Sequence, residues 1–210
     1  MTTYQVYNLI ILDESESMES VKQSIIRGFN KVVRTIKGIT KQFPEKTQFI
    51  SFVTFNGLGV RTHLNKKPTA SLEQINQHSY HPGSSAPLYD AIGKSVLELK
   101  TDLVGKDHVD VRVTILSDGV ENASEKFSLT QIRLIIAEQK KRGWTFNYIG
   151  ANQVFWKAAA GNSVTNEIQS GNSFEDDQLI SEVENFSRPH YSEKMLLMEA
   201  LGQGFYNFNN

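Results

Sequence analysis

Short apolar runs alternate with amphipathic segments along most of the chain. Four of the runs have the length and the β-branched or aromatic character of strands, at residues 6–12, 48–55, 109–116 and 144–150. Apolar residues at three- and four-residue spacing predict amphipathic helices over residues 19–38, 88–99 and 129–141. This alternation predicts an α/β fold: a doubly wound, mostly parallel sheet with right-handed crossovers and helices on both faces.

One strand of this sheet is expected to run antiparallel. Asn56 and Gly57 follow the second apolar run and form a typical hairpin signal. Residues 59–64 should therefore return as an antiparallel edge strand, and the positive charges and proline at 66–68 limit further pairing of that edge.

The length of 210 residues suits one α/β domain and is short for two. We predict a core domain over residues 1–160. Residues 161–210 are predicted to form a C-terminal helix and an aromatic-rich tail that packs on the same domain, because exposed aromatic side chains disfavour solubility.

Charge and composition narrow the function classes. A formal net charge of -1 argues against nonspecific binding to nucleic acid or to an anionic membrane. The absence of cysteine excludes disulfides, a thiolate nucleophile and cysteine-ligated zinc, and it is compatible with a reducing compartment. No apolar stretch approaches the ~20 residues that span a bilayer, and no basic segment precedes the first apolar run, so we expect a cytoplasmic protein.

The first apolar run ends in a turn that is rich in oxygen donors. Asp13, Ser15 and Ser17 alternate there, at the end of a strand where open parallel sheets bind ligands. Such hard donors, without thiol or imidazole, suit Mg²⁺ better than zinc. These residues could equally cap the helix expected from about residue 19, because Asp and Ser are preferred caps. Asp118 ends the third apolar run in the same way, and the Gly-Ser-Ser loop at residues 83–85 leads into the helix expected from residue 88. Convergence of these three segments on one edge of the sheet favours metal binding over capping.

These motifs resemble the von Willebrand factor type A domain. The metal-ion-dependent adhesion site of that family opens with Asp-x-Ser-x-Ser, which Asp13, Ser15 and Ser17 match in full. Its final acid lies in an apolar-Ser/Thr-Asp-Gly setting, as Asp118 does, and its middle Pro-Leu-Tyr-x-Ala-Ile element corresponds to residues 87–92. The resemblance covers residues 4–160 and implies a bound divalent cation, Mg²⁺ or alternatively Mn²⁺ or Ca²⁺.

The chain departs from the family pattern in the middle element. The family has a metal-contacting threonine directly before the proline, and here that position is Ala86, which has no side-chain oxygen. Ser85, or its neighbour Ser84, could supply the oxygen if the loop shifts by one residue. The ligand set implied by the resemblance is therefore Asp13, Ser15, Ser17 and Asp118, with Ser85 as the substitute and water completing the shell.

The resemblance implies a non-enzymatic, bacterial, protein-binding domain whose cation engages an acidic residue of a protein partner. Glu14 and Glu16 make the rim of the site acidic, which could repel an acidic partner. The first alternative is an interaction scaffold with a degenerate metal site, which Ala86 supports. The second is a magnesium-dependent phosphohydrolase with Asp13 as nucleophile. The usual second aspartate of such enzymes is replaced here by Ser15. The histidines, at positions 63, 78, 81, 108 and 190, have no spaced partner and are interpreted as solvated surface residues.

Overall fold

The computed structural model describes residues 4–150. These residues form a five-stranded sheet in the order β3-β2-β1-β4-β5. The strands are β1 (Gln5–Asp13), β2 (Thr47–Asn56), β3 (Gly59–Pro68), β4 (Val109–Leu116) and β5 (Thr145–Ile149). All neighbouring pairs are parallel except β2 and β3, which pair antiparallel, so the mostly parallel sheet with one antiparallel edge strand is confirmed.

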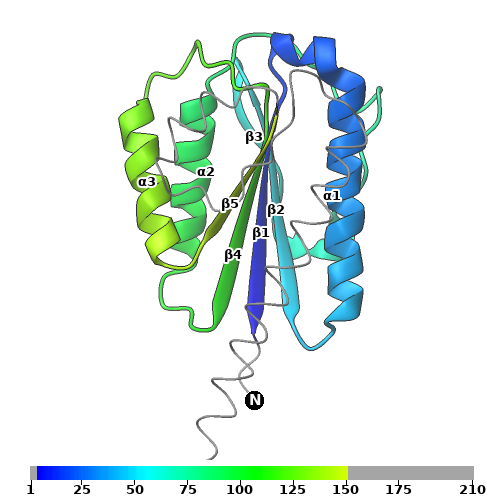
Figure 1. Ribbon diagram of the computed structural model, residues 1–210, viewed down its shortest axis with the longest axis vertical. Helices are drawn as coiled ribbons and strands as arrows, with labels where there is room; N and C mark the ends of the chain where they lie inside the picture. Colours follow the sequence, from blue (N-terminus) through cyan, green and yellow to red (C-terminus); the bar gives the residue numbers. More distant parts are fainter. Residues whose placement is uncertain (1–3, 151–210) are drawn as a thin grey trace, which may run out of the picture.

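Helices cover both faces of the sheet, as predicted. Helix α1 (Lys22–Gln42) lies on one face, and α2 (Leu88–Asp102) and α3 (Leu129–Lys141) lie on the other (Figure 1). Alternate residues of β1 serve the two cores: Ile10 and Leu12 pack toward α1, whereas Leu9 and Ile11 pack toward α2 and α3. This two-sided burial explains why the first apolar run is nearly continuous rather than alternating.

Two element boundaries differ from the expectation. The edge strand continues to Pro68, beyond the predicted end at residue 64, because Lys67 and Pro68 still pair with β2. The first helix begins as a 3-10 helix, η1 (Glu16–Val21), and becomes α-helical only at Lys22. A second 3-10 helix, η2 (Thr69–Ser71), follows the edge strand directly.

The register of the central strands decides which turns meet. Leu12 of β1 pairs with Leu116 of β4, so Asp13 and Ser117 are the next residues on two adjacent strands. On the other side Asp13 pairs with Phe55 of β2. The turns after β1, β2 and β4 therefore share the carboxyl edge of the sheet, which is where such sheets bind ligands.

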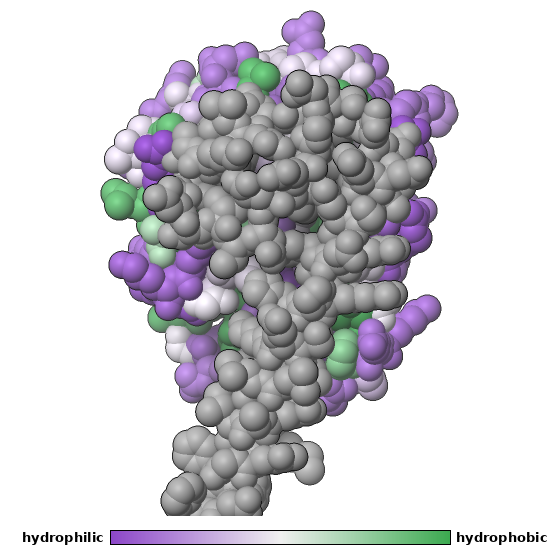
Figure 2. Space-filling model, in the orientation of Figure 1, coloured by the Kyte–Doolittle hydropathy of each residue, from purple (hydrophilic) through white to green (hydrophobic). Residues whose placement is uncertain are grey.

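The large hydrophobic side chains exposed among residues 4–150 are Leu58, Val104, Val120 and Leu134. In Figure 2 the described residues around the margin are mostly hydrophilic, with separate hydrophobic spots. Leu58 and Val104 are strongly exposed, but they lie in different turns. Within residues 4–150 no helix has both the length and the apolarity to cross a bilayer. The helix and tail predicted for residues 161–210 lie outside the described residues, and so does the end of the predicted core domain.

Candidate metal centre

Asp13 is a fully buried carboxylate at the end of the central strand. Its Oδ1 accepts a hydrogen bond from the Ser15 N–H at 2.8 Å, and its Oδ2 accepts one from Ser117 Oγ at 2.6 Å. Burial raises the pKa of this carboxyl to about 6 although these hydrogen bonds lower it, and the Asp118 carboxylate raises it further. No basic side chain of the described residues acts on Asp13 to offset this cost. Ionising this carboxyl group inside the fold therefore costs free energy.

The two serines of the first turn have their hydroxyls close together. Ser15 is buried and Ser17 half-buried, and their Oγ atoms lie 3.1 Å apart. Neighbouring oxygens around an octahedral Mg²⁺ with ligand distances of about 2.1 Å would be separated by roughly 3.0 Å. The hydrogen-bonded pair of hydroxyls thus has the spacing of two adjacent ligands of one such ion.

Helix capping does not explain these serines. Ser15 stands at the N-cap position of η1, but its side chain makes no capping hydrogen bond. Ser17 lies inside η1, and the residue that precedes α1 is Val21, which has no side-chain cap either. The capping interpretation was therefore wrong, and both hydroxyls are left for another role.

The turn after β4 brings the second acid and an unexpected serine to the site. Ser117 is buried and bridges the two turns: its Oγ donates to Asp13 and accepts the Gly119 N–H at 2.9 Å. Asp118 receives the Val120 N–H on Oδ1 at 3.0 Å, while its own N–H donates to the sulfur of Met18 at 3.3 Å. Gly119 has φ = 83°, a conformation that favours glycine, and this turn points the chain away after the acid.

Two tyrosines fix the backbone on which these residues stand. Tyr80 is buried and donates its hydroxyl hydrogen to the Asp13 carbonyl at 2.6 Å. Tyr148 of β5 donates to the Ser117 carbonyl at 2.5 Å. The sequence analysis missed both tyrosines and the bridging role of Ser117. Ser117 was visible within the Ser-Asp-Gly motif, but no local pattern connects Tyr80 or Tyr148 with the two turns.

Ser84 and Ser85 face the hairpin between β2 and β3. A Cβ added at Gly57 would lie only 2.3 Å from Ser84 Oγ and 2.4 Å from Ser85 Oγ, so the hairpin needs glycine at this close approach. The same loop is tied to the first turn by backbone bonds, Glu16 N–H to the Ser84 carbonyl and Gly83 N–H to the Glu14 carbonyl, each 2.8 Å. The loop is thus next to Asp13, with its serine hydroxyls close to the hairpin. A role of Ser85 as metal ligand stays a prediction.

Ala86 is held in place by its backbone. The residue is 1% exposed, and its N–H donates to Asn122 Oδ1 at 2.8 Å while its carbonyl accepts the Asn122 N–H at 3.2 Å. This reciprocal pair joins the middle loop to the turn after β4. Three separate segments of the chain therefore meet at one edge of the sheet, as the motifs predicted.

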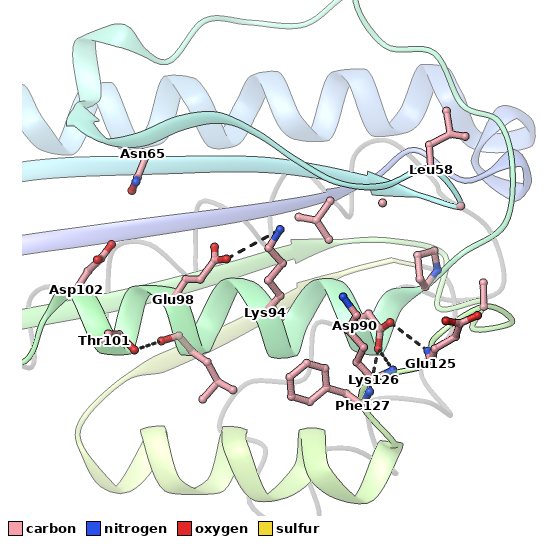
Figure 3. A pocket seen from close by; sticks show the side chains of 16 residues that line it. Leu58, Asn65, Asp90, Lys94, Glu98, Thr101, Asp102, Glu125, Lys126 and Phe127 are labelled. Carbon is pink, nitrogen blue, oxygen red and sulfur yellow. Dashed lines mark hydrogen bonds and ion pairs between the residues drawn. The ribbon is translucent and has the colours of Figure 1, made fainter.

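Other acids at this edge are used by the protein itself. Asp90, in the first turn of α2, accepts three backbone N–H groups at 2.9 to 3.1 Å, those of Glu125, Lys126 and Phe127 (Figure 3). Glu121 accepts N–H or O–H groups of Tyr89, Ala123 and Ser124 at 2.7 to 3.0 Å. These two carboxylates fasten the β4–α3 loop to the start of α2.

The donor atoms at this edge are oxygens, which suit a hard cation such as Mg²⁺. Nowhere in residues 4–150 do three His, Asp or Glu side chains gather as a metal cluster, so the donors at this edge are two carboxylates and hydroxyls. Mg²⁺ accepts such a set because it keeps several waters. Two of the described histidines have hydrogen-bond partners elsewhere. His63 lies in β3 and bonds Thr54 Oγ1 at 2.9 Å, and the His81 ring contacts the His78 carbonyl at 2.8 Å.

A doubly wound sheet with an oxygen-lined carboxyl edge is thus the class of structure that the geometry defines. The family model of the von Willebrand factor type A domain matches residues 9–198, and the chain belongs to this family. Domains of this family typically mediate protein–protein interactions. No curated protein matches the sequence.

Solved structures agree on the fold. Proximal thread matrix protein 1 from the mussel byssus is 19% identical with a TM-score of 0.58, and the match covers 87% of this chain and 47% of that one. The pilus adhesin SpaC from Lactobacillus rhamnosus GG is 10% identical with a TM-score of 0.61, covering 90% of this chain and 31% of that one. The chain therefore spans less than half the length of either protein.

Proposed function

We propose that this chain is a non-enzymatic protein-binding domain that uses a divalent cation, Mg²⁺ or else Mn²⁺ or Ca²⁺, to engage an acidic residue of a partner protein. The residues that would hold the cation are Asp13, Ser15, Ser17 and Asp118, with Ser85 as a further candidate. The bound cation would supply a positive charge with a coordination position open to a partner carboxylate.

The single observation that carries the proposal is the buried charge of Asp13. A carboxylate with no exposed surface, close to a second carboxylate and without a basic partner among the described residues, is costly unless a cation accompanies it. Ser117 orients this carboxylate, and Tyr80 and Tyr148 hold the carbonyls of the two turns. The chain's own contribution is therefore a set of oxygens that is already arranged before a partner arrives.

Thermal unfolding of the full chain with and without Mg²⁺ tests the proposal. Binding to the folded state alone stabilises by about 2.7 kcal/mol at a cation concentration of 100 times Kd. For a chain of this size the Tm should then rise on the order of 5 to 10 °C. Asp13→Ala should abolish the rise, whereas Asp107→Ala, at an exposed position in the α2–β4 loop, should retain it. An unchanged Tm of the unmutated protein at millimolar Mg²⁺ would refute the proposal.

A metal-independent interaction scaffold is the second candidate, and Ala86 is the observation that favours it. Ala86 has no side-chain oxygen, so the site lacks an oxygen at the usual threonine position. The residue is buried and Asn122 bonds its backbone, which holds Ala86 in this position. Ala86→Thr should tighten Mg²⁺ binding roughly tenfold, or about 1.4 kcal/mol, if the loop has the family geometry. Calorimetric titration measures this, and an affinity unchanged from the parent would indicate that Ser84 or Ser85 already supplies the oxygen.

The phosphohydrolase alternative has no support from the site. The acid that such enzymes carry two residues after the nucleophile is Ser15 here, and its hydroxyl is engaged with Ser17. Phosphatase turnover that disappears in Asp13→Asn would reverse this ranking. A cytoplasmic location and a bacterial origin remain predictions from the sequence.

A further inference from the structure

A pocket of about 350 Å³ opens beside the candidate metal centre, between the β2–β3 end of the sheet and the segment of residues 71–80. Leu12 and Glu14, the two neighbours of Asp13 in the sequence, both line it. Tyr80 is also part of its wall, and the Tyr80 hydroxyl bonds the Asp13 carbonyl. The pocket and the candidate metal centre therefore share the end of β1, at residues 12–14.

The lining of the pocket combines apolar and polar side chains, and its formal charges are of one sign. Phe52, Leu64 and Ile75 contribute apolar surface. The ionisable groups of the lining, besides Tyr80, are Glu14, Glu73 and His63, with no lysine or arginine. Burial, and then the nearby Arg61 charge, lower the pKa of His63, so its ring is neutral at pH 7.

Acidic side chains continue from the pocket into the first metal turn, because Glu14 of the lining is followed two residues later by the exposed Glu16. The cleft between β3 and α2 differs because charges of both signs line it: Asp90, Glu98, Asp102 and Glu125, with Lys94 and Lys126 (Figure 3). The lining of the smaller pocket has two glutamates and no lysine or arginine.

We propose that this pocket receives a lysine or arginine side chain of the partner protein, next to the acidic residue that the cation engages. The apolar side chains of the lining suit the aliphatic stem of such a side chain, and Glu14 and Glu73 suit its charged end. The volume lies near the lower limit for ligand sites and is large enough for one such side chain. This inference rests on the proposed function only for the position of the partner at the metal. The preference of the pocket for a positive charge does not depend on a bound cation.

The preference of the pocket for a positive charge also bears on the repulsion between the acidic rim and an acidic partner. Glu14 and Glu16 are next to Asp13 and Ser15 in the sequence, and they would repel a partner that is acidic throughout. A basic side chain beside the acidic residue removes this repulsion. The pocket would then select partners that carry both charges at the correct spacing.

Amide NMR spectra of the full 210-residue chain, titrated with N-acetyl-arginine methylamide in EDTA, test the inference. We expect saturable shifts at Glu73, Gln74 and Ser79. The citrulline analogue, of similar shape but neutral, should bind about fivefold more weakly. Glu73→Gln should weaken arginine binding by a similar factor, and Glu45→Gln, an exposed glutamate before β2, should leave it unchanged.

Equal binding of citrulline, shifts outside the pocket, or the absence of saturable shifts would overturn the inference. A subsequent Mg²⁺ titration of the same samples reports the metal centre through the amides of Ser15, Ser17 and Asp118. Magnesium shifts without arginine binding would leave the proposed function standing and remove the pocket's role. Arginine binding without magnesium shifts would support the pocket's role and refute the proposed function. Glu73→Gln should not alter the magnesium response.

Discussion

Asp13 and Asp90 are two aspartates at the carboxyl edge of the same sheet, and they differ in what their carboxylates accept. Asp90 is half-buried and receives three backbone N–H groups of the β4–α3 loop. Asp13 is fully buried and receives one backbone N–H and one hydroxyl, while Asp118 adds a like charge nearby. The Asp90 charge is satisfied within the protein, and the Asp13 charge is not.

The difference separates a structural acid from a candidate ligand. Backbone N–H groups favour the ionised form of a carboxyl group, whereas burial and a neighbouring carboxylate disfavour it. The pKa of Asp13 is raised to about 6 for the second reason. An acid that the fold buries at such a cost, at the edge where ligands bind, has a role that its hydrogen bonds alone do not explain.

Asp90→Ala should have the largest effect on stability and none on metal binding. Three N–H groups would lose their acceptor, and we expect the free energy of unfolding to fall by about 2–4 kcal/mol. Urea denaturation measures this loss. The Mg²⁺-induced rise in Tm should persist, because Asp90 is not among the proposed ligands.

Asp107→Ala provides the control for this change, since Asp107 is exposed in the α2–β4 loop. Its stability should stay within about 0.5 kcal/mol of the parent. If Asp90→Ala abolished the Mg²⁺ response as Asp13→Ala is expected to do, the distinction between the two aspartates would be lost.

The sequence could predict the layout that brings these acids together. Continuous apolar runs and helical periodicity are properties of single segments, and they predicted the strands, the helices and the antiparallel edge. The bounds of α3, Leu129–Lys141, agree fully with the predicted range. Because parallel strands end at one edge, the motif positions alone also predicted that the turns of Asp13 and Asp118 would meet.

Asp13→Asn should change how stability depends on pH. In the metal-free protein the pKa of Asp13 is about 6 when folded and near 3.8 when unfolded. The proton therefore favours the folded state, and this stabilisation, present below pH 4, is lost as the pH rises through about 6. The loss is on the order of 2–3 kcal/mol. The stability of the parent relative to Asp13→Asn should fall by this amount between pH 4 and pH 7.

Magnesium supplies the control for this titration. The cation needs the ionised carboxylate, so its affinity should decrease about tenfold for each pH unit below 6 and should be constant well above it. At pH 7, Mg²⁺ should restore the stability of the parent and leave Asp13→Asn unchanged. If the stability of the parent and of Asp13→Asn had the same pH dependence, ionisation of Asp13 in the folded state would cost no free energy.

The details that decide the site depend on contacts between remote residues. The hydroxyl of Ser117 meets Asp13 across 104 positions of sequence, and that of Tyr80 meets the Asp13 carbonyl across 67. Nor could a single segment reveal that Ser84 and Ser85 approach Gly57. Capping was a wrong alternative for Ser15 and Ser17 because a 3-10 turn precedes α1, a local choice that Asp and Ser preferences do not determine.

Ser117→Ala should have the smallest effect and tests how the Asp13 carboxylate is positioned. Removing the Oγ takes one hydrogen bond from the Asp13 carboxylate and should cost about 1–2 kcal/mol. Because this bond lowers the pKa of Asp13, its loss should raise the pH at which Mg²⁺ binding is half lost. Ser95→Ala is the matched control, since Ser95 is a buried serine whose Oγ has no hydrogen-bond partner among the described residues. It should be neutral or slightly stabilising and leave the pH profile unchanged. If Mg²⁺ binding had the same pH dependence in Ser117→Ala and Ser95→Ala, Ser117 would pack beside Asp13 without changing the pKa of its carboxyl group.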